Sequence, residues 1–309
     1  MNNVPLPLRS SRPAIRVMTF NIHYDTGLDG PHPNNWASRR ARVVESIRLG
    51  APDIAGLQEP LPHQVADLQT DLGADHEIIA ASRTDDRLGG GEHMVILFRR
   101  ACFVLLDHGS FWLSETPAIP GSIGWDASAP RLALWTLLRP VVPGIHTDVL
   151  VCCTHLDHLG AEARLHGATL VRRHTAALAQ GVPVIIMGDF NAESHEAPHA
   201  AMTDPRDSIS PPLCDVTHAP PCALNARRPT FRGFTGYGDD GRPRPAVIDF
   251  IFHDPRLVPE GYEVIEQRHN GCYPSDHLPA VATLRFPSVS RPAFVQNPTS
   301  PVTPRSLHP

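Results

Sequence analysis

The 309-residue sequence contains no lysine, so all 27 of its basic residues are arginine. This absence excludes chemistry that depends on a lysine amine, namely Schiff-base catalysis and nucleotide binding by the usual phosphate-binding loop. A basic excess is also missing, since the formal net charge is −5. That balance argues against a general polyanion-binding protein. No apolar stretch is long enough to predict a membrane span.

Cysteine pairs of the Cys-x-x-Cys type are absent as well. The sequence has six cysteines, and Cys152 and Cys153 are neighbours in an apolar run. We therefore predict reduced core residues rather than a disulfide framework or a zinc site. The first residues lack an apolar block of secretory length, which predicts a cytoplasmic protein.

Hydrophobic residues make up 41% of the chain, enough for a sizeable core. We expect a flexible leader over residues 1–13 and a proline-rich disordered tail over residues 287–309. Nothing in residues 14–286 has the composition of a linker, so we expect that range to form one domain. The oligomeric state cannot be predicted from these features.

Short apolar runs dominate the chain and predict strands, sometimes adjacent and sometimes separated by helices. One helix is predicted after Asn35, with Trp36, Val43, Val44 and Ile47 on one face. A second is predicted over residues 161–179. This mixture favours an α/β fold of mixed sheets covered by helices over an all-parallel barrel.

Several predicted strands end on a polar residue that can bind a metal or move a proton. These residues are Asn21, Glu59, His155, Asp189 with Asn191, Asp249, and Asp276 with His277. Loops at strand ends commonly carry the chemistry of α/β proteins. Asp249 lies within the apolar run VIDFIF, and burying a carboxylate without a partner costs several kcal/mol. We therefore expect Asp249 to have a buried donor, for which a histidine is a natural choice.

Taken together, these segments resemble the endonuclease/exonuclease/phosphatase superfamily, which has the deoxyribonuclease-I-like fold. The resemblance rests on MTFNIHYD, PDIAGLQE, FWLSETP, THLDH, GDFNA, TFRGFTG, VIDFIF and SDHLPAV, which occur in the family's order. FWLSETP and TFRGFTG are similar to the bacterial-type metal-dependent hydrolase branch. The resemblance implies a four-layer sandwich in which two mixed β-sheets pack face to face with helices outside.

The resemblance also implies a hydrolase that uses Mg²⁺ or Mn²⁺ to cleave a phosphomonoester or phosphodiester. Oxygen ligands suit these cations, and the resemblance supports Glu59, Asn21 and Asp276 as the metal-binding residues. It further implies catalytic roles for His155, Asp189, Asn191, Asp249 and His277, with Asp189 as the general base and Asp249 orienting His277. Arg131 is a substrate-binding candidate. One departure is His23, which stands where the abasic-site endonuclease branch has an acid.

The substrate remains open at this level. The acidic balance favours a small phosphorylated substrate over duplex DNA, and a nuclease acting on DNA or RNA ends is the alternative. Specificity is expected in the loops at 82–92, 114–130 and 232–246, although Glu92 and His93 are interpreted as surface-loop residues. Three further hypotheses are a zinc hydrolase built on THLDH, a non-catalytic phosphate-binding relative, and a nucleic-acid module using the arginine-rich stretches at 39–42, 226–228 and 242–244.

Overall fold

The computed structural model describes residues 13–27, 32–84, 91–206, 210–219, 228–235 and 245–287. Apart from Pro13 and Pro287, the predicted leader and tail lie outside these residues. The arginines at 227, 242 and 244 do so too, as do parts of the loops at 82–92 and 232–246. Within the described ranges, no helix is long and apolar enough to cross a lipid bilayer.

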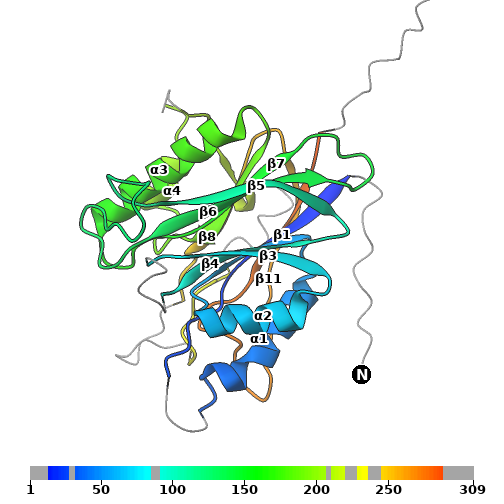
Figure 1. Cartoon of the computed structure of the whole chain (residues 1–309), viewed down its shortest axis with the longest axis vertical. Coiled ribbons are helices and arrows are strands. Elements are labelled where there is room, and N and C mark those ends of the chain that lie inside the picture. The colour runs from blue at the N-terminus through cyan, green and yellow to red at the C-terminus, as the bar shows by residue number, and fades with distance from the viewer. Residues whose placement is uncertain are drawn as a thin grey trace, which may run out of the picture.

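Two six-stranded sheets pack face to face (Figure 1). The first sheet has the order β11-β12-β1-β2-β4-β3 and the second has the order β5-β6-β7-β8-β10-β9. The first consists of β1 (Ala14–Asn21), β2 (Ile54–Gln58), β3 (His76–Ser82), β4 (His93–Arg99), β11 (Val258–Val264) and β12 (Ala280–Arg285). The second consists of β5 (Phe103–Trp112), β6 (Leu132–Pro140), β7 (Val149–His155), β8 (Val184–Asp189), β9 (Cys214–Asp215) and β10 (Asp249–His253).

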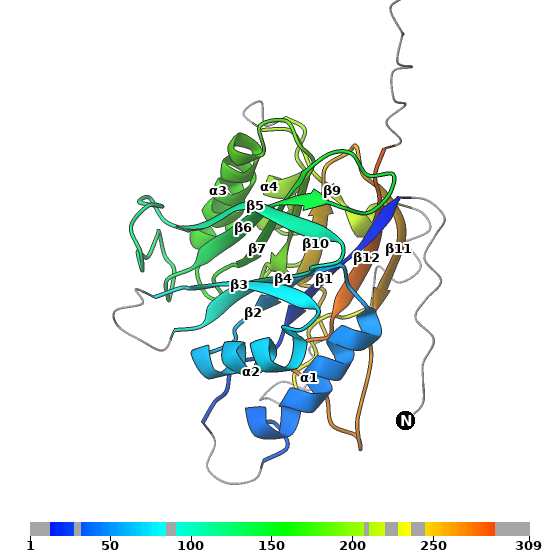
Figure 2. The same cartoon turned by 45° about the vertical axis from the view of Figure 1, so that its right-hand side comes forward.

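Helices cover the outer face of each sheet (Figures 1 and 2). Those on the first sheet are α1 (Trp36–Gly50) and α2 (Pro62–Leu72), and those on the second are α3 (Ala161–Ala179) and α4 (Ala197–Thr203). A short 3₁₀ helix, η2 (Val216–His218), follows β9. The predicted α/β four-layer sandwich is therefore confirmed.

The inner faces of the two sheets form the main core. Val17 and Ile96 of the first sheet belong to the same buried cluster as Val151 and Met187 of the second. The sheets approach so closely at Gly56 that an added Cβ would lie 2.9 Å from Cys153 Sγ. All six residues of β8 are buried, as expected for a strand covered on both faces.

The strand directions bring the chemical groups to one end of the sandwich. β1 runs parallel to β2, and β7 runs parallel to β8, so the carboxyl ends of each pair lie together. β10 is antiparallel to β8, which places Asp249 opposite Asp189. β12 is antiparallel to β1, so the residues just before β12 lie beside the end of β1. Groups distant in the sequence thereby meet at one edge of the fold.

Some sequence predictions were wrong. Arg39 belongs to the arginine-rich stretch at 39–42 considered for nucleic-acid binding, yet it is fully buried. Arg172 of α3, for which the sequence made no prediction, is also buried, and it donates to the carbonyls of Ala201, Ser210 and Pro211. The expectation of core cysteines holds for Cys102, Cys152 and Cys153 but fails for exposed Cys214 and half-buried Cys272, while Cys222 lies outside the described residues.

Candidate active site

A pocket of about 400 Å³ opens at the strand ends where the two sheets meet. Seven of the nine site residues predicted from the sequence line it, and the other two, Asn21 and Asp249, lie directly behind it. Asn21 is hydrogen-bonded to Glu59 and Asp189, and Asp249 is hydrogen-bonded to His277. The pocket-lining predicted residues are Glu59, Arg131, His155, Asp189, Asn191, Asp276 and His277.

Three residues that line this pocket have a strained backbone conformation. Glu59, His23 and Asn191 have φ angles of 75°, 60° and 46°, in the left-handed region that non-glycine residues rarely adopt. Such residues cost on the order of 1–3 kcal/mol each and persist where surrounding contacts hold them. Glu59 follows the last residue of β2, so this conformation turns its carboxylate away from the strand and into the pocket.

On the side of the first sheet, the carboxylates of Glu59 and Asp276 face His23. Asn21 Nδ2 donates to Glu59 Oε1 at 2.8 Å, and the Tyr24 backbone N–H donates to Glu59 Oε2 at 3.0 Å. His23 Nδ1 lies 3.6 Å from Glu59 Oε2 and 3.4 Å from Asp276 Oδ2. Burial alone would raise the pKa of Asp276, but the His23 hydrogen bond and the charge of His277 hold that pKa well below its usual range.

Arg39 connects two backbone segments on the side of the first sheet. Its guanidinium donates to the backbone carbonyls of Ile22, His23, Tyr24 and Pro274. Burial lowers the pKa of Arg39 to about 10, opposed most by the charge of Asp276. The residue thereby ties the loop after β1 to the segment that carries Asp276.

On the side of the second sheet, Asp189 is the central group. Its Oδ1 accepts from the Asn191 backbone N–H at 2.9 Å, and its Oδ2 accepts from Asn21 Nδ2 at 3.1 Å. Burial, followed by the nearby charge of Asp249, raises the pKa of Asp189 to about 7. A carboxylate with that pKa can take a proton near neutral pH.

The expected partner of the buried Asp249 is His277. His277 Nδ1 lies 2.9 Å from Asp249 Oδ2, and its Nε2 lies 3.6 Å from Asp189 Oδ2. Burial would lower the pKa of His277, but the charges of Asp249 and Asp189 together raise it well above its ordinary value. His277 is therefore a cation at neutral pH.

His155 has the opposite character although it lies equally close to Asp189. Its Nε2 is 3.4 Å from Asp189 Oδ2 and 3.0 Å from Asn191 Nδ2. Burial, together with the charges of Arg131 and His277, lowers the pKa of His155 well below its ordinary value. The two histidines at Asp189 thus differ in charge, with His155 neutral and His277 protonated.

Arg131 is poised to meet an anion. It is 5% exposed, and its Nε donates to Asp157 Oδ2 at 3.3 Å. Its Nη1 is buried and has no hydrogen-bond partner among the described residues. A buried guanidinium N–H that borders a pocket and lacks a partner is suited to a phosphoryl oxygen of a ligand.

Within the THLDH segment, His155 belongs to a group of potential metal ligands with Glu59 and Glu92, whereas Asp157 has a different role. Asp157 Oδ1 accepts from the backbone N–H groups of Leu159 and Gly160, and its Oδ2 accepts from Ser128 and Arg131. Both oxygens of the Asp157 carboxylate are therefore used to stabilise the loop before α3. Among the described residues, neither group of potential metal ligands that includes a pocket residue contains Asp157.

Several pocket residues were missed or misinterpreted at the sequence level. Glu92, which we interpreted as a surface-loop residue, lines the pocket. Arg83 Nη1 donates to Glu92 Oε2 at 2.7 Å. Burial, followed by the charge of Glu59, raises the pKa of Glu92 to about 7. His93, by contrast, begins β4. Tyr24, His158 and Phe231 also line the pocket. Tyr24 and His158 stand beside recognised motif residues, which was the available signal.

Comparison with known proteins agrees with this architecture. The sequence profile described as Endonuclease/Exonuclease/phosphatase family matches residues 18–277, and the chain therefore belongs to that family. A comparison with curated protein sequences gave no match.

Among solved structures, the chain is similar to an endonuclease/exonuclease/phosphatase family protein from Bacteroides thetaiotaomicron, with 30% identity and a TM-score of 0.77 over 89% of this chain and 95% of that one. It is similar to a mannosyl-6-phosphatase from the same organism, with 30% identity and a TM-score of 0.74 over 88% of this chain and 100% of that one. The human nocturnin catalytic domain shares the fold, with 22% identity and a TM-score of 0.64 over 89% of this chain and 96% of that one.

Proposed function

We propose that the protein is a phosphoesterase that uses Mg²⁺ or Mn²⁺ and hydrolyses a small phosphorylated substrate. The observation that carries the proposal is the meeting of Glu59, Asp276, Asp189 and His277, from four distant parts of the chain, around one pocket. Family membership supports hydrolysis of a phosphoester bond. The finer assignment of cation and substrate rests on the chemistry of these side chains.

Glu59 and Asp276 are the residues proposed to hold the cation, with Asn21 supporting Glu59 through its hydrogen bond. Two carboxylates fit a hard divalent cation. His23 Nδ1 faces both carboxylates, and an imidazole nitrogen favours Mn²⁺ over Mg²⁺. A bound cation would neutralise phosphoryl charge during hydrolysis.

The side chains of the second sheet are proposed to carry out the proton transfer. Asp189 accepts a proton from the attacking water as the water oxygen bonds to phosphorus and the ester P–O bond breaks, and the departing alkoxide takes a proton from solvent water. His277, charged through its contact with Asp249, donates Nε2–H to a phosphoryl oxygen as negative charge develops. Asn191 orients the phosphate, and Arg131 offers its unpaired Nη1 to another oxygen. His155, neutral, contributes hydrogen bonding without charge.

A small phosphomonoester is favoured as the substrate for three reasons. A pocket of about 400 Å³ is in the range of small-molecule sites. The net charge of −5 opposes a long polyanion. One relative of 30% identity is a mannosyl-6-phosphatase, which makes sugar phosphates the first substrates to test. Nucleic acid ends are the alternative.

The test is a phosphoester panel assayed with Mg²⁺, with Mn²⁺ and with a chelator. The panel should hold sugar phosphates, nucleotides, generic mono- and diesters, oligonucleotides and phospholipids. We expect cation-dependent release of inorganic phosphate from a small phosphomonoester, and loss of release in Asp189→Asn. Phosphate binding without turnover of any ester, under every cation condition, would support the non-catalytic alternative instead.

A further inference from the structure

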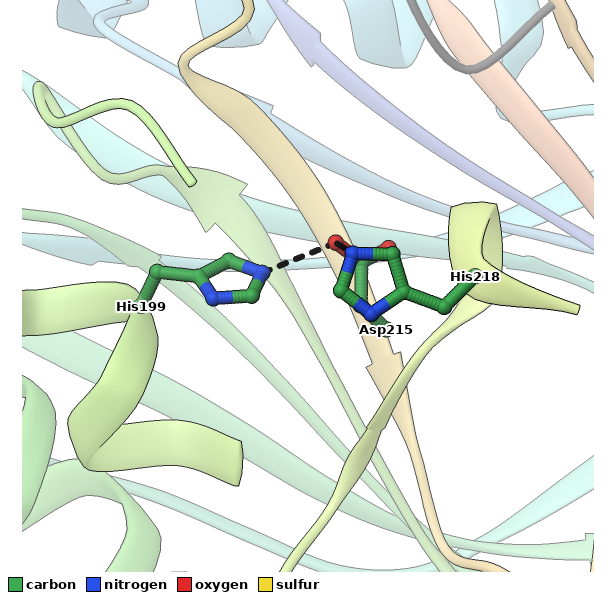
Figure 3. A group of neighbouring side chains, drawn as sticks. All are labelled: His199, Asp215 and His218. Atoms are coloured by element: carbon green, nitrogen blue, oxygen red, sulfur yellow. Dashed lines mark hydrogen bonds and ion pairs between the residues drawn. The ribbon is translucent and has the colours of Figure 1, made fainter. Parts of the chain in front are cut away.

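Outside the pocket, a further group of potential metal ligands lies at the edge of the second sheet (Figure 3). It consists of His199 from α4, Asp215 from β9 and His218 from η2. One ligand atom from each residue lies within 4.8 Å of the other two. His199 Nε2 is 2.9 Å from Asp215 Oδ2, and His218 Nε2 is 3.8 Å from the same oxygen.

The Asp215 carboxylate is fixed in place by its other oxygen. Asp215 Oδ1 accepts from both the backbone N–H and the hydroxyl of Thr217, each at 2.8 Å. Oδ2 is left facing the two imidazole rings. The two bonds from Thr217 hold the carboxylate in a fixed orientation, as hydrogen bonds do for carboxylates that bind metals.

We infer that His199, Asp215 and His218 form a binding site for a transition-metal dication of the Zn²⁺ class. Zinc bound by imidazole nitrogen and carboxylate oxygen at about 2.0–2.1 Å places neighbouring tetrahedral ligands about 3.3 Å apart. The observed separations of 2.9 and 3.8 Å lie on either side of that value. Two imidazoles suit Zn²⁺ better than Mg²⁺. The site is thus chemically different from the oxygen-rich pocket.

This site is separate from the phosphoesterase pocket. His199 packs on Phe250 and Phe252, at ring-centroid distances of 5.1 and 5.3 Å. Both phenylalanines belong to the cluster between the second sheet and its helices, whereas Ile251 faces the core between the sheets. The three ligands therefore lie on the outer, helix-covered face of the second sheet.

A different role for the group is a structural His–Asp contact, in which His199 alone serves the buried carboxylate. His218 separates the two hypotheses. Its side chain is 65% exposed, so a purely structural contact gains little from it, whereas a metal site needs it as the third ligand. Because the His218 side chain is exposed, an ion bound by the three residues would keep its remaining coordination position open to solvent. The bound ion would link α4, β9 and η2 at the sheet edge.

The test uses the full chain with Glu59→Gln, which removes a proposed ligand of the pocket cation. Zn²⁺ is titrated against a chromophoric chelator in excess Mg²⁺, and the melting temperature is recorded with and without Zn²⁺. Because outer-shell partners alone change metal affinity by about 10- to 100-fold, we expect His218→Ala to weaken Zn²⁺ binding by about 100-fold or more. The matched control is His166→Ala, another exposed histidine, on α3.

We expect one Zn²⁺ per chain that excess Mg²⁺ does not displace, and a higher melting temperature with Zn²⁺. Both effects should persist in the His166→Ala control and disappear in His218→Ala, which folds because its side chain is exposed. The inference is overturned if the parent binds no such Zn²⁺, if His218→Ala binds it equally well, or if the control loses it to the same extent.

Discussion

The two sheets contribute different chemistry to the pocket. The first brings Glu59 just after β2, with Asn21 at the end of β1 behind it, and the second brings His155 and Asp189 at the ends of β7 and β8. Glu59 is only partly buried, whereas Asp189 is 1% exposed. Half-buried oxygen donors suit a cation that arrives from solvent, and a deeply buried carboxylate suits proton transfer. The difference in burial thus separates the two proposed tasks.

His277 connects the two sides. It lies in the segment leading to β12 of the first sheet, yet its ring contacts Asp249 and Asp189 of the second. The charge of His277 is therefore set by carboxylates from the opposite sheet. Removing single groups from either side should separate cation binding from proton transfer.

The largest effect is expected for Asp189→Asn. Loss of a general base typically costs about 10²- to 10⁴-fold, and we expect a fall in kcat of about 10³-fold that added Mg²⁺ or Mn²⁺ does not restore. Because the folded pKa of about 7 lies above the reference value of 3.8, ionised Asp189 destabilises the metal-free fold increasingly as pH rises between these values. The variant should therefore melt at a higher temperature than wild type at pH 8. A lower melting temperature would indicate a structural role.

Glu59→Gln should weaken cation binding, the task proposed for the side of the first sheet. We expect about 10- to 100-fold weaker Mn²⁺ binding, since a ligand should matter at least as much as an outer-shell group. Unlike Asp189→Asn, this variant should recover part of its activity as the cation concentration rises. Calorimetric titration with Mn²⁺ measures the binding directly. Unchanged Mn²⁺ affinity would remove Glu59 from the cation site.

Asp249→Asn should alter the connection between the sheets. Asp249 and Asp189 raise the pKa of His277, so activity requiring protonated His277 is present below that pKa and lost above it. Replacing Asp249 with a neutral amide lowers the pKa, and the alkaline limb of the kcat–pH profile should move to lower pH. We expect a fall of about tenfold at pH 7.5, below the roughly 10²- to 10⁴-fold contribution of a whole acid–base group, because the variant shifts the pKa of His277 without removing it. An alkaline limb at the wild-type position would contradict the assignment.

The smallest effect on chemistry is expected for Asp157→Asn, which should act on stability. Burial opposes the low pKa of Asp157, but hydrogen bonds from Gly160, Leu159 and Ser128 hold it well below the reference value of 3.8. Its stabilising contribution is present above that value and is lost as pH falls through the folded pKa. Breaking buried charged contacts costs about 3 kcal/mol. In urea, the free energy of unfolding of the variant should be lower than that of wild type by this amount at pH 7 and by less below pH 4. An equal difference at both pH values would contradict the account.

The sequence indicated which residues gather at the pocket more completely than it indicated the packing. Polar residues that end apolar strands, such as Asn21 and Asp189, are visible in one dimension because each interrupts a hydrophobic pattern. Their meeting follows from parallel strand pairs that share an edge. Glu92 was not visible in this way, because its position at the pocket depends on the path of the loop before β4.

Elements with weak patterns are also difficult to predict from the sequence. β5 is mostly exposed or half-buried along its length, so it lacks a clear alternation. α4 has only seven residues, too few for a helical period. Buried Arg39 and Arg172 escape any hydropathy pattern, because their burial is compensated by backbone carbonyls contributed by distant segments.

The most direct test of the central claim is a crystal structure of the protein soaked with Mn²⁺ and inorganic phosphate, with manganese located by anomalous scattering. The account predicts manganese bonded to Glu59 and Asp276, with phosphate oxygens in contact with His277 and Arg131. Manganese bound away from both carboxylates, or phosphate bound outside the pocket, would contradict it.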